Sequence, residues 1–121
     1  MLLAHTPITD LGVGHLSGLH RLRMLVLDSC HVTNAGLASL AGLTGLVHLD
    51  LSDTAVTSSG LVHVARMTNL THLNLFSTGV SDVGAGYVTA LVRLTTLNLD
   101  SRLITDDSLA CLTALHALLE L

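Results

Sequence analysis

Two histidines stand beside polar partners at matched positions, and these side chains could do chemistry together. His48 and Asp50 are two residues apart, and His72 and Asn74 repeat that spacing 24 residues later. Imidazole and carboxylate groups bind zinc and are common general acids and bases. A zinc site needs about four ligands, or three and a water, within roughly 2.0–2.3 Å of one point. Side chains on one face of a parallel sheet point outward side by side, so we expect no metal, and a bound metal is a weak alternative.

The motifs of known catalytic classes are absent from the sequence. There is no HExxH, P-loop or G-x-S-x-G motif. Gly12-Val13-Gly14 is followed by Gly18, which is one residue too late for a dinucleotide-binding loop. Serine, histidine and aspartate do occur together, but a sheet face offers no pocket that excludes water and no second layer of orienting groups. We therefore expect that the protein is not an enzyme and uses no cofactor.

A 24-residue repeat positions all of these side chains. Each unit carries an LxL core, whose alternation predicts a short strand, and then a T-D-x-G-L-x-x-L segment that predicts a short helix. Successive strands must be parallel, because each returns through a long crossover. The sequence predicts one domain over 1–121, made of the units 1–18 (partial), 19–42, 43–66, 67–90, 91–114 and 115–121 (partial).

The start of each helical segment repeats two features. One is a column of glycines, Gly36, Gly60 and Gly84, which we expect to let each helix start lie close to its neighbour. The other is a hydroxyl residue that can cap its own helix by accepting a backbone N–H bond. The residues expected to do so, themselves or through the Asp or Ser that follows, are Thr9, Thr33, Thr57, Ser81 and Thr105.

The pattern LxxLxxLxLxxTxITDxGLxxLxx resembles a leucine-rich repeat of the ribonuclease-inhibitor-like, cysteine-containing or plant type. The resemblance covers the whole chain. It implies an α/β fold, a right-handed leucine-rich-repeat solenoid with a parallel sheet on the concave face and short helices on the convex face. It also implies a protein-interaction module that binds its partner on the concave sheet face. Some members are substrate receptors of ubiquitin ligases, and this is a weaker alternative because no F-box-like segment precedes the repeats.

The resemblance also implies a column of buried residues that hydrogen-bond neighbouring loops. In this chain the column is Thr6, Cys30, Thr54, Thr78 and Arg102. Arg102 departs from the pattern, since a guanidinium is not buried unpaired. Either the last loop flares outward, or Asp100, Asp106 or Asp107 pairs with Arg102. Cys30 and Cys111 belong to units three steps apart, so we expect no disulfide and a Cys30 that is a small buried side chain.

The outward strand positions are not dictated by the fold, so they are the predicted partner-binding surface. His48, Asp50, His72, Asn74 and Phe76 are its predicted centre, because an exposed aromatic beside polar groups is typical of a binding hot spot. The predicted rim residues are Asp28, Asn98 and Asp100. The acidic rim and the net charge of −4 favour a partner with a basic patch. The alternative is an ordinary solvated sheet face on a structural spacer segment of a longer solenoid.

Composition excludes two classes of partner. Five arginines against nine acidic residues leave no basic patch for nucleic acid. Mean hydropathy is +0.66, yet no run approaches the roughly 18–20 apolar residues of a membrane span. The N-terminus lacks the pattern of a signal peptide, so we expect a location in the cytoplasm or the nucleus.

Two further alternatives concern the ends and the histidines. The units at both ends are uncapped, which favours a fragment of a longer solenoid or self-association of chains end to end. Protonation of all eight histidines would move the formal charge from −4 to −4 + 8 = +4, which admits a pH switch between about pH 7 and 5.5. Solvated surface histidines are the simpler interpretation.

Overall fold

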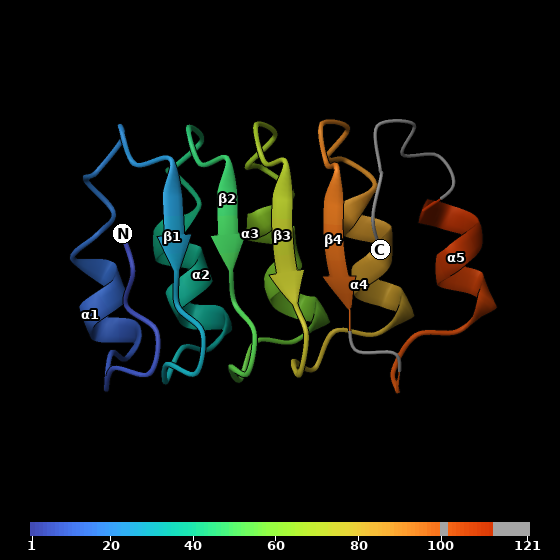
Figure 1. Ribbon diagram of the computed structural model, residues 1–121, viewed down its shortest axis with the longest axis horizontal. Coiled ribbons are helices and arrows are strands. Elements are labelled where there is room, and N and C mark those ends of the chain that lie inside the picture. The colour runs from blue at the N-terminus through green and yellow to red at the C-terminus, as the bar shows by residue number, and fades with distance from the viewer. Residues whose placement is uncertain (100–101, 113–121) are drawn as a thin grey trace.

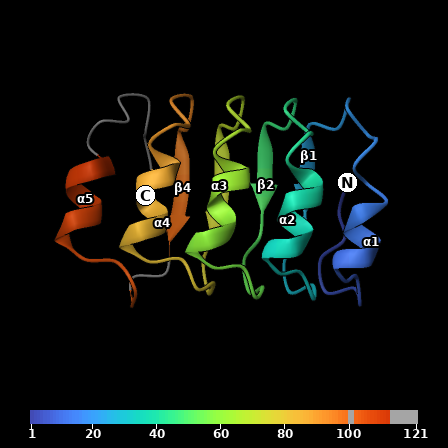
Figure 2. The same ribbon diagram turned by 180° about the vertical axis from the view of Figure 1, so that it is seen from behind.

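The computed structural model describes residues 1–99 and 102–112, and of Leu109 and Cys111 the backbone alone. Over these residues, short strands and helices alternate along the chain. They are α1 (Asp10–Gly14), β1 (Met24–Val26), α2 (Asn34–Leu40), β2 (His48–Asp50), the 3-10 helix η1 (Ser58–Gly60), α3 (Leu61–Val64), β3 (His72–Leu75), α4 (Asp82–Val88), β4 (Thr96–Leu99) and α5 (Asp106–Leu112). The strands form one layer (Figure 1), and the helices form a second layer behind it (Figure 2). The predicted α/β solenoid is confirmed.

The strands pair in the register that the repeat predicts. Their order is β1-β2-β3-β4, and all neighbours are parallel. Met24 lies opposite His48, His48 opposite His72, and Asp50 opposite Asn74. A slip of one residue would turn every leucine of a strand away from the helices, so burial of the leucines fixes which side chains face outward.

The aliphatic columns form one continuous core between the two layers. Leu25, Leu49, Leu73 and Leu97, one from each strand, are at most 1% exposed. Burial of such a side chain stabilises the fold by roughly 1.5–3 kcal/mol. Helices of four to seven residues are marginal alone, so this packing is what holds them in place.

Side chains of one repeat also hold the helix start of the next repeat. Asp10 accepts hydrogen bonds from the backbone N–H of Thr33 (2.8 Å) and from its hydroxyl (2.5 Å). Asn34 accepts from the backbone N–H of Thr57 (2.9 Å) and donates to its hydroxyl (2.7 Å). We call this series the helix-start ladder. It continues from Ser58 to Ser81 and from Asp82 to Thr105.

The helix-start ladder corrects the predicted caps. Thr33 and Thr105 do accept a bond from a backbone N–H of their own helix, at 3.2 and 3.3 Å. The side chains of Thr9, Thr57 and Ser81 make no such bond. The hydroxyls of Thr57 and Ser81 bond to the preceding repeat instead, and the ladder satisfies the backbone N–H of the residue that precedes the helix at Thr33, Thr57, Ser81 and Thr105.

The glycine column makes room for the ladder. A Cβ atom at Gly36 would lie 2.5 Å from Asp10 Oδ1, and a Cβ atom at Gly60 would lie 2.3 Å from Asn34 Oδ1. Atoms that are not bonded do not approach so closely. The expectation that this column permits close approach is confirmed, and the group that approaches is the ladder side chain.

The last repeat replaces this glycine by Ser108. Its hydroxyl donates to Asp82, and so does the hydroxyl of Thr105. These hydrogen bonds, Ser108 first, hold the pKa of the Asp82 carboxyl below its ordinary value of 3.8, against a small opposing effect of desolvation.

The threonines of the predicted loop column donate their hydroxyl protons within their own loops. Thr6, Thr54 and Thr78 each donate to the backbone carbonyl three residues earlier, at 2.6, 2.7 and 2.6 Å. A hydroxyl has one proton, so none is left to donate to the next loop. The predicted ladder between loops is therefore wrong for Thr54 and Thr78, whereas Thr6 Oγ1 lies 3.7 Å from Cys30 Sγ in the next loop.

Cys30 is the member of that column that reaches the preceding repeat. It is a free, buried thiol, as predicted, and its Sγ donates to the carbonyl of Leu3 at 3.0 Å. The side chain of Cys111 lies outside the described residues, so the absence of a disulfide between the two cysteines stays a prediction. Arg102 is exposed, at a position where Cys30 and Thr78 are buried and Thr6 and Thr54 are half-buried.

Candidate functional site

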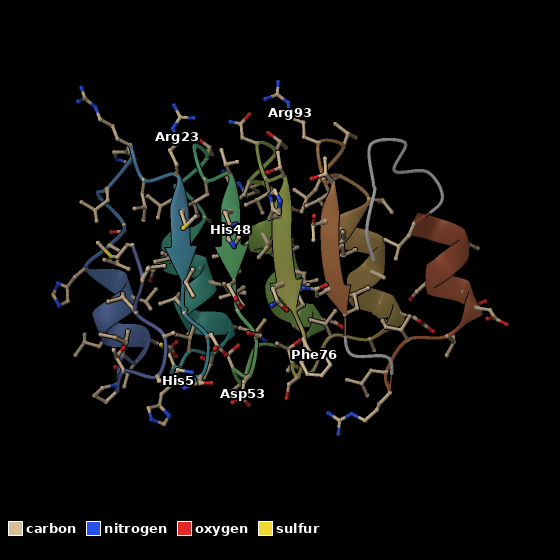
Figure 3. All side chains as sticks on the ribbon, in the orientation of Figure 1. His5, Arg23, His48, Asp53, Phe76 and Arg93 are labelled. Carbon is tan, nitrogen blue, oxygen red and sulfur yellow. The ribbon has the colours of Figure 1, made fainter. Side chains whose placement is uncertain are left out.

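The outward side chains of the strands, and of the loops that follow them, form a surface that we call the strand face. Seven of the eight predicted contact residues lie on it, and Asp100 lies outside the described residues. Figure 3 shows His48 near the middle of this face, Phe76 at the edge where the strands end, and Arg23 and Arg93 at the opposite edge. Its three rows are Met24, His48, His72 and Thr96, then Val26, Asp50, Asn74 and Asn98, then Asp28, Ser52 and Phe76.

The two histidines of the predicted centre stack on each other. The ring centroids of His48 and His72 are 5.2 Å apart, and the ring planes differ by 12°. The hydroxyl of Thr71 lies 2.8 Å from Nδ1 of His72 and fixes that ring. In-plane lone pairs of parallel rings point side by side, so they do not converge on one ion. Within the described part of the chain, no three His, Cys, Asp or Glu residues group to hold a metal ion.

One hydroxyl joins two carboxylates beside these histidines. Ser52 Oγ lies 2.6 Å from Asp50 Oδ1 and 3.1 Å from Asp28 Oδ1, and the Ser52 backbone N–H donates to Asp50 Oδ1 at 2.9 Å. The hydroxyl has one proton to share between the two carboxylates. Both carboxylates therefore keep acceptor capacity toward solvent, where a lysine or arginine of a partner could donate.

A third carboxylate extends this group along the edge where the strands end. Ser29 Oγ lies 3.1 Å from Asp28 Oδ1 and 3.0 Å from Asp53 Oδ2. His5 Nε2 approaches Asp28 Oδ2 at 3.5 Å. We call Asp28, Asp50 and Asp53 the acidic edge.

The turns that follow β1, β2 and β3, and the equivalent turn at His5, share one backbone feature at this edge. One residue per turn has a left-handed backbone, with φ of 58° at His5, 58° at Ser29, 53° at Asp53 and 56° at Ser77. Aspartate and histidine tolerate this conformation better than most residues. His5, Ser29 and Asp53 also donate their backbone N–H to the next repeat, as Asp53 does to the carbonyl of Phe76 at 2.9 Å.

Phe76 is exposed, as predicted, and lies over a hollow. It is 58% exposed, and Asn74 Oδ1 accepts a hydrogen bond from its backbone N–H at 3.0 Å. One hollow of about 370 Å³ is lined by Ser52, Asn74, Phe76, Asn98 and Leu99. A second, of about 220 Å³, is lined by His48, Asp50, His72, Leu73, Asn74, Thr96 and Asn98. Both hollows are shallow and open to solvent, because they lie between side chains of unequal length, so they do not contradict the expectation that the face has no pocket that excludes water.

The predicted contact set omits two features of the strand face. The first is Ser52, which is buried and joins the carboxylates although its sequence context carries no motif. The second is an apolar strip at β1, made of Leu2, Met24 and Val26. Leu2 is 73% exposed and Met24 is 42% exposed. The signal for the strip was present in the sequence, since all three residues fall in the outward columns of the repeat.

A model of the family described as leucine rich repeat matches residues 20–80, which is half of the chain. No helix among the described residues has the length and hydropathy needed to cross a bilayer. No curated protein matches the sequence. The family match does not distinguish subtypes, so the ribonuclease-inhibitor-like subtype stays a prediction.

Solved structures supply the remaining comparisons. A crystal structure of internalin C2 from Listeria monocytogenes is 29% identical with a TM-score of 0.82, and the alignment covers 99% of this chain and 49% of that one. An internalin (InlF) of the same species is 23% identical with a TM-score of 0.77, covering 98% and 32%. Actin-binding site 2 of leiomodin-1 is 12% identical with a TM-score of 0.79, covering 97% and 78%. The last two show the fold alone, and the chain spans about half of internalin C2 and a third of InlF.

Proposed function

The chain belongs to the leucine-rich-repeat family, and from this premise we propose that it is a protein-interaction module that binds its partner on the strand face. Domains of this family are generally non-catalytic modules that bind proteins. The proposed contact centre is His48, Asp50, His72, Asn74 and Phe76, with Asp28 and Asn98 at its rim. The partner presents a basic patch to the acidic edge.

Phe76 is the observation that carries this proposal. An aromatic side chain that is 58% exposed leaves apolar surface in water, and its neighbours Asn74 and Asn98 line the same hollow. Burial of such a ring in an interface is typical of a hot spot, whose truncation costs about 2 kcal/mol or more of binding free energy. The carboxylates of Asp28 and Asp50 add acceptors that a basic partner satisfies.

The test is capture of a partner by the immobilised chain, followed by measurement of the binding affinity of the purified pair. The strand-face variant is His72→Ala/Phe76→Ala. Its matched control is Val83→Ser/Tyr87→Ala on α4, where both side chains are exposed in the helix layer. Circular dichroism first establishes that both variants fold. We expect a partner that binds wild type and the control and loses at least about thirtyfold in affinity for the strand-face variant.

Equal capture by all three proteins would contradict the proposal. The chain would then act as a structural spacer, whose strand face tolerates substitution. A partner lost by the control alone would move the site to the helix layer.

A second candidate function is self-association through the first repeat. Leu11 and Leu19 are 79% and 41% exposed, and Leu19 helps to line an apolar hollow of about 520 Å³ at residues 18–22. Association that grows with concentration, and that Leu11→Ser/Leu19→Ser abolishes, is expected in light scattering. A monodisperse monomer at high micromolar concentration would contradict it.

A further inference from the structure

The apolar strip lies between opposite charges. Along β1, Arg23 precedes Met24 and Val26, and Asp28 follows them. Leu2 joins the strip through its parallel bridge to Val26. At roughly 3.3 Å per residue, the five steps from Arg23 to Asp28 span about 16 Å. One strand therefore presents a cation, an apolar stretch and an anion in that order.

Arginines also lie at the edge of the sheet where other strands begin. Arg21 and Arg23 precede β1 and Arg93 precedes β4, and we call these three residues the basic edge. Figure 3 shows Arg23 and Arg93 at the edge opposite Asp53. Arg21 and Arg93 occupy the same position in their repeats, shortly before the strand.

The two edges do not neutralise each other. Their separation of about 16 Å is twice the Debye length of about 8 Å at physiological ionic strength. Within residues 1–99 and 102–112, neither Arg21 nor Arg23 forms an ion pair, and the acidic edge has His5 near Asp28. Each edge is therefore open to a group of opposite charge.

We propose that the segment bound on the strand face is bipolar: acidic residues at one end, aliphatic residues in the middle and basic residues at the other end, lying along β1. This inference rests on the proposed function and adds the direction and the chemistry of the partner. The acidic end faces Arg21 and Arg23, the aliphatic side chains cover Met24 and Leu2, and the basic end faces the acidic edge. A uniformly basic segment is attracted to the acidic edge but repelled by the basic edge. The strand face should therefore bind a bipolar segment more tightly than a uniformly basic one.

Three synthetic peptides of about twelve residues test the proposal by NMR titration of the isotope-labelled chain. The first has an acidic block, an aliphatic block and a basic block. The second has the same composition with alternating charges, and the third is uniformly basic around the same aliphatic block. We expect the block peptide to bind at least about fivefold more tightly than the other two at low salt, with the difference shrinking at high salt.

A nitroxide label on the block peptide shows in which direction the bound peptide lies along β1. At the basic end it should broaden the amide signals of Asp28 and Asp53, and at the acidic end those of Arg21 and Arg23. The variant Arg23→Glu should weaken the block peptide about three- to tenfold. Its matched control, Arg66→Glu, is an exposed charge after α3 in the helix layer and should change nothing.

Equal affinity of the block and alternating peptides, tightest binding by the basic peptide, or no binding at millimolar concentration would overturn the proposal. Such a result would not contradict the proposed function, which the capture experiment tests independently. A captured partner that tolerates Arg23→Glu but not His72→Ala/Phe76→Ala would keep the strand face as the site and remove the bipolar segment.

Discussion

The variant Gly60→Ala measures how much the helix-start ladder stabilises the fold. The new Cβ atom would lie 2.3 Å from Asn34 Oδ1 and 2.9 Å from Leu37 Cδ1. Asn34 must then move and release its two bonds to Thr57, at 2.9 and 2.7 Å.

The expected loss follows from these contacts. Two hydrogen bonds contribute about 0.5–1.5 kcal/mol each, and overpacking costs about 1–3 kcal/mol. Alanine regains about 0.5–1 kcal/mol over glycine in a helix. Gly60→Ala should therefore lower the free energy of unfolding by about 1–5.5 kcal/mol.

Urea unfolding followed by circular dichroism measures this change. The matched control is Gly86→Ala in α4, where nothing lies within 4 Å of the new Cβ atom, and it should raise stability by about 0.5–1 kcal/mol. Adding Asn34→Ala to Gly60→Ala removes the clash with Asn34, so the double variant should be more stable than the sum of the single changes predicts. Equal stability of the two glycine variants, or strict additivity in the double variant, would refute the reasoning.

Three other predictions use the same unfolding measurement. The stability that wild type gains over Asp82→Asn should be present above pH 3.8 and fade as pH falls further, because the hydrogen bonds from Ser108 and Thr105 lower the pKa of the folded carboxyl; a difference that grows on acidification would contradict this. Ser77→Val should cost about 1–2 kcal/mol because its φ is 56°, whereas Ser77→Gly should be near neutral; equal effects would disprove the strain. Leu73→Ala should cost about 2–5 kcal/mol against less than about 0.5 kcal/mol for the exposed Val92→Ala, and similar losses would argue against the described core.

The fold was predictable because every unit repeats the same pattern of leucines. A strand of three or four residues is a weak signal alone, but the leucine columns fix which side of every strand is buried, and burial fixes the register. The outward rows, and with them seven of the eight contact residues, follow from the same alternation.

The helix-start ladder was not predictable by local capping rules. Those rules pair a side chain with a backbone N–H two or three residues later, whereas Asp10 accepts a hydrogen bond from Thr33, 23 residues later. The signal was the pairing of two columns, an Asp, Asn or Ser that opens each helix and a glycine in the next repeat. Either column alone has a simpler explanation.

The detail of the site depends on side-chain geometry, which the spacing of residues in the sequence does not predict. Nothing in the sequence shows that Ser52 divides one proton between Asp28 and Asp50. The hollows beside Phe76 likewise depend on the lengths of neighbouring side chains. The apolar strip was visible in the outward rows, where aliphatic residues are not needed for folding.

The most direct measurement is an NMR titration of the isotope-labelled chain with its purified partner, read by cross-saturation from the partner. We predict that the amide signals losing intensity belong to residues 48–52 and 72–76, and that the exposed residues of α3 and α4, such as Val62 and Val83, are unaffected. Saturation concentrated on α3 and α4, with the strand face unchanged, would contradict the proposal that this protein binds through its sheet.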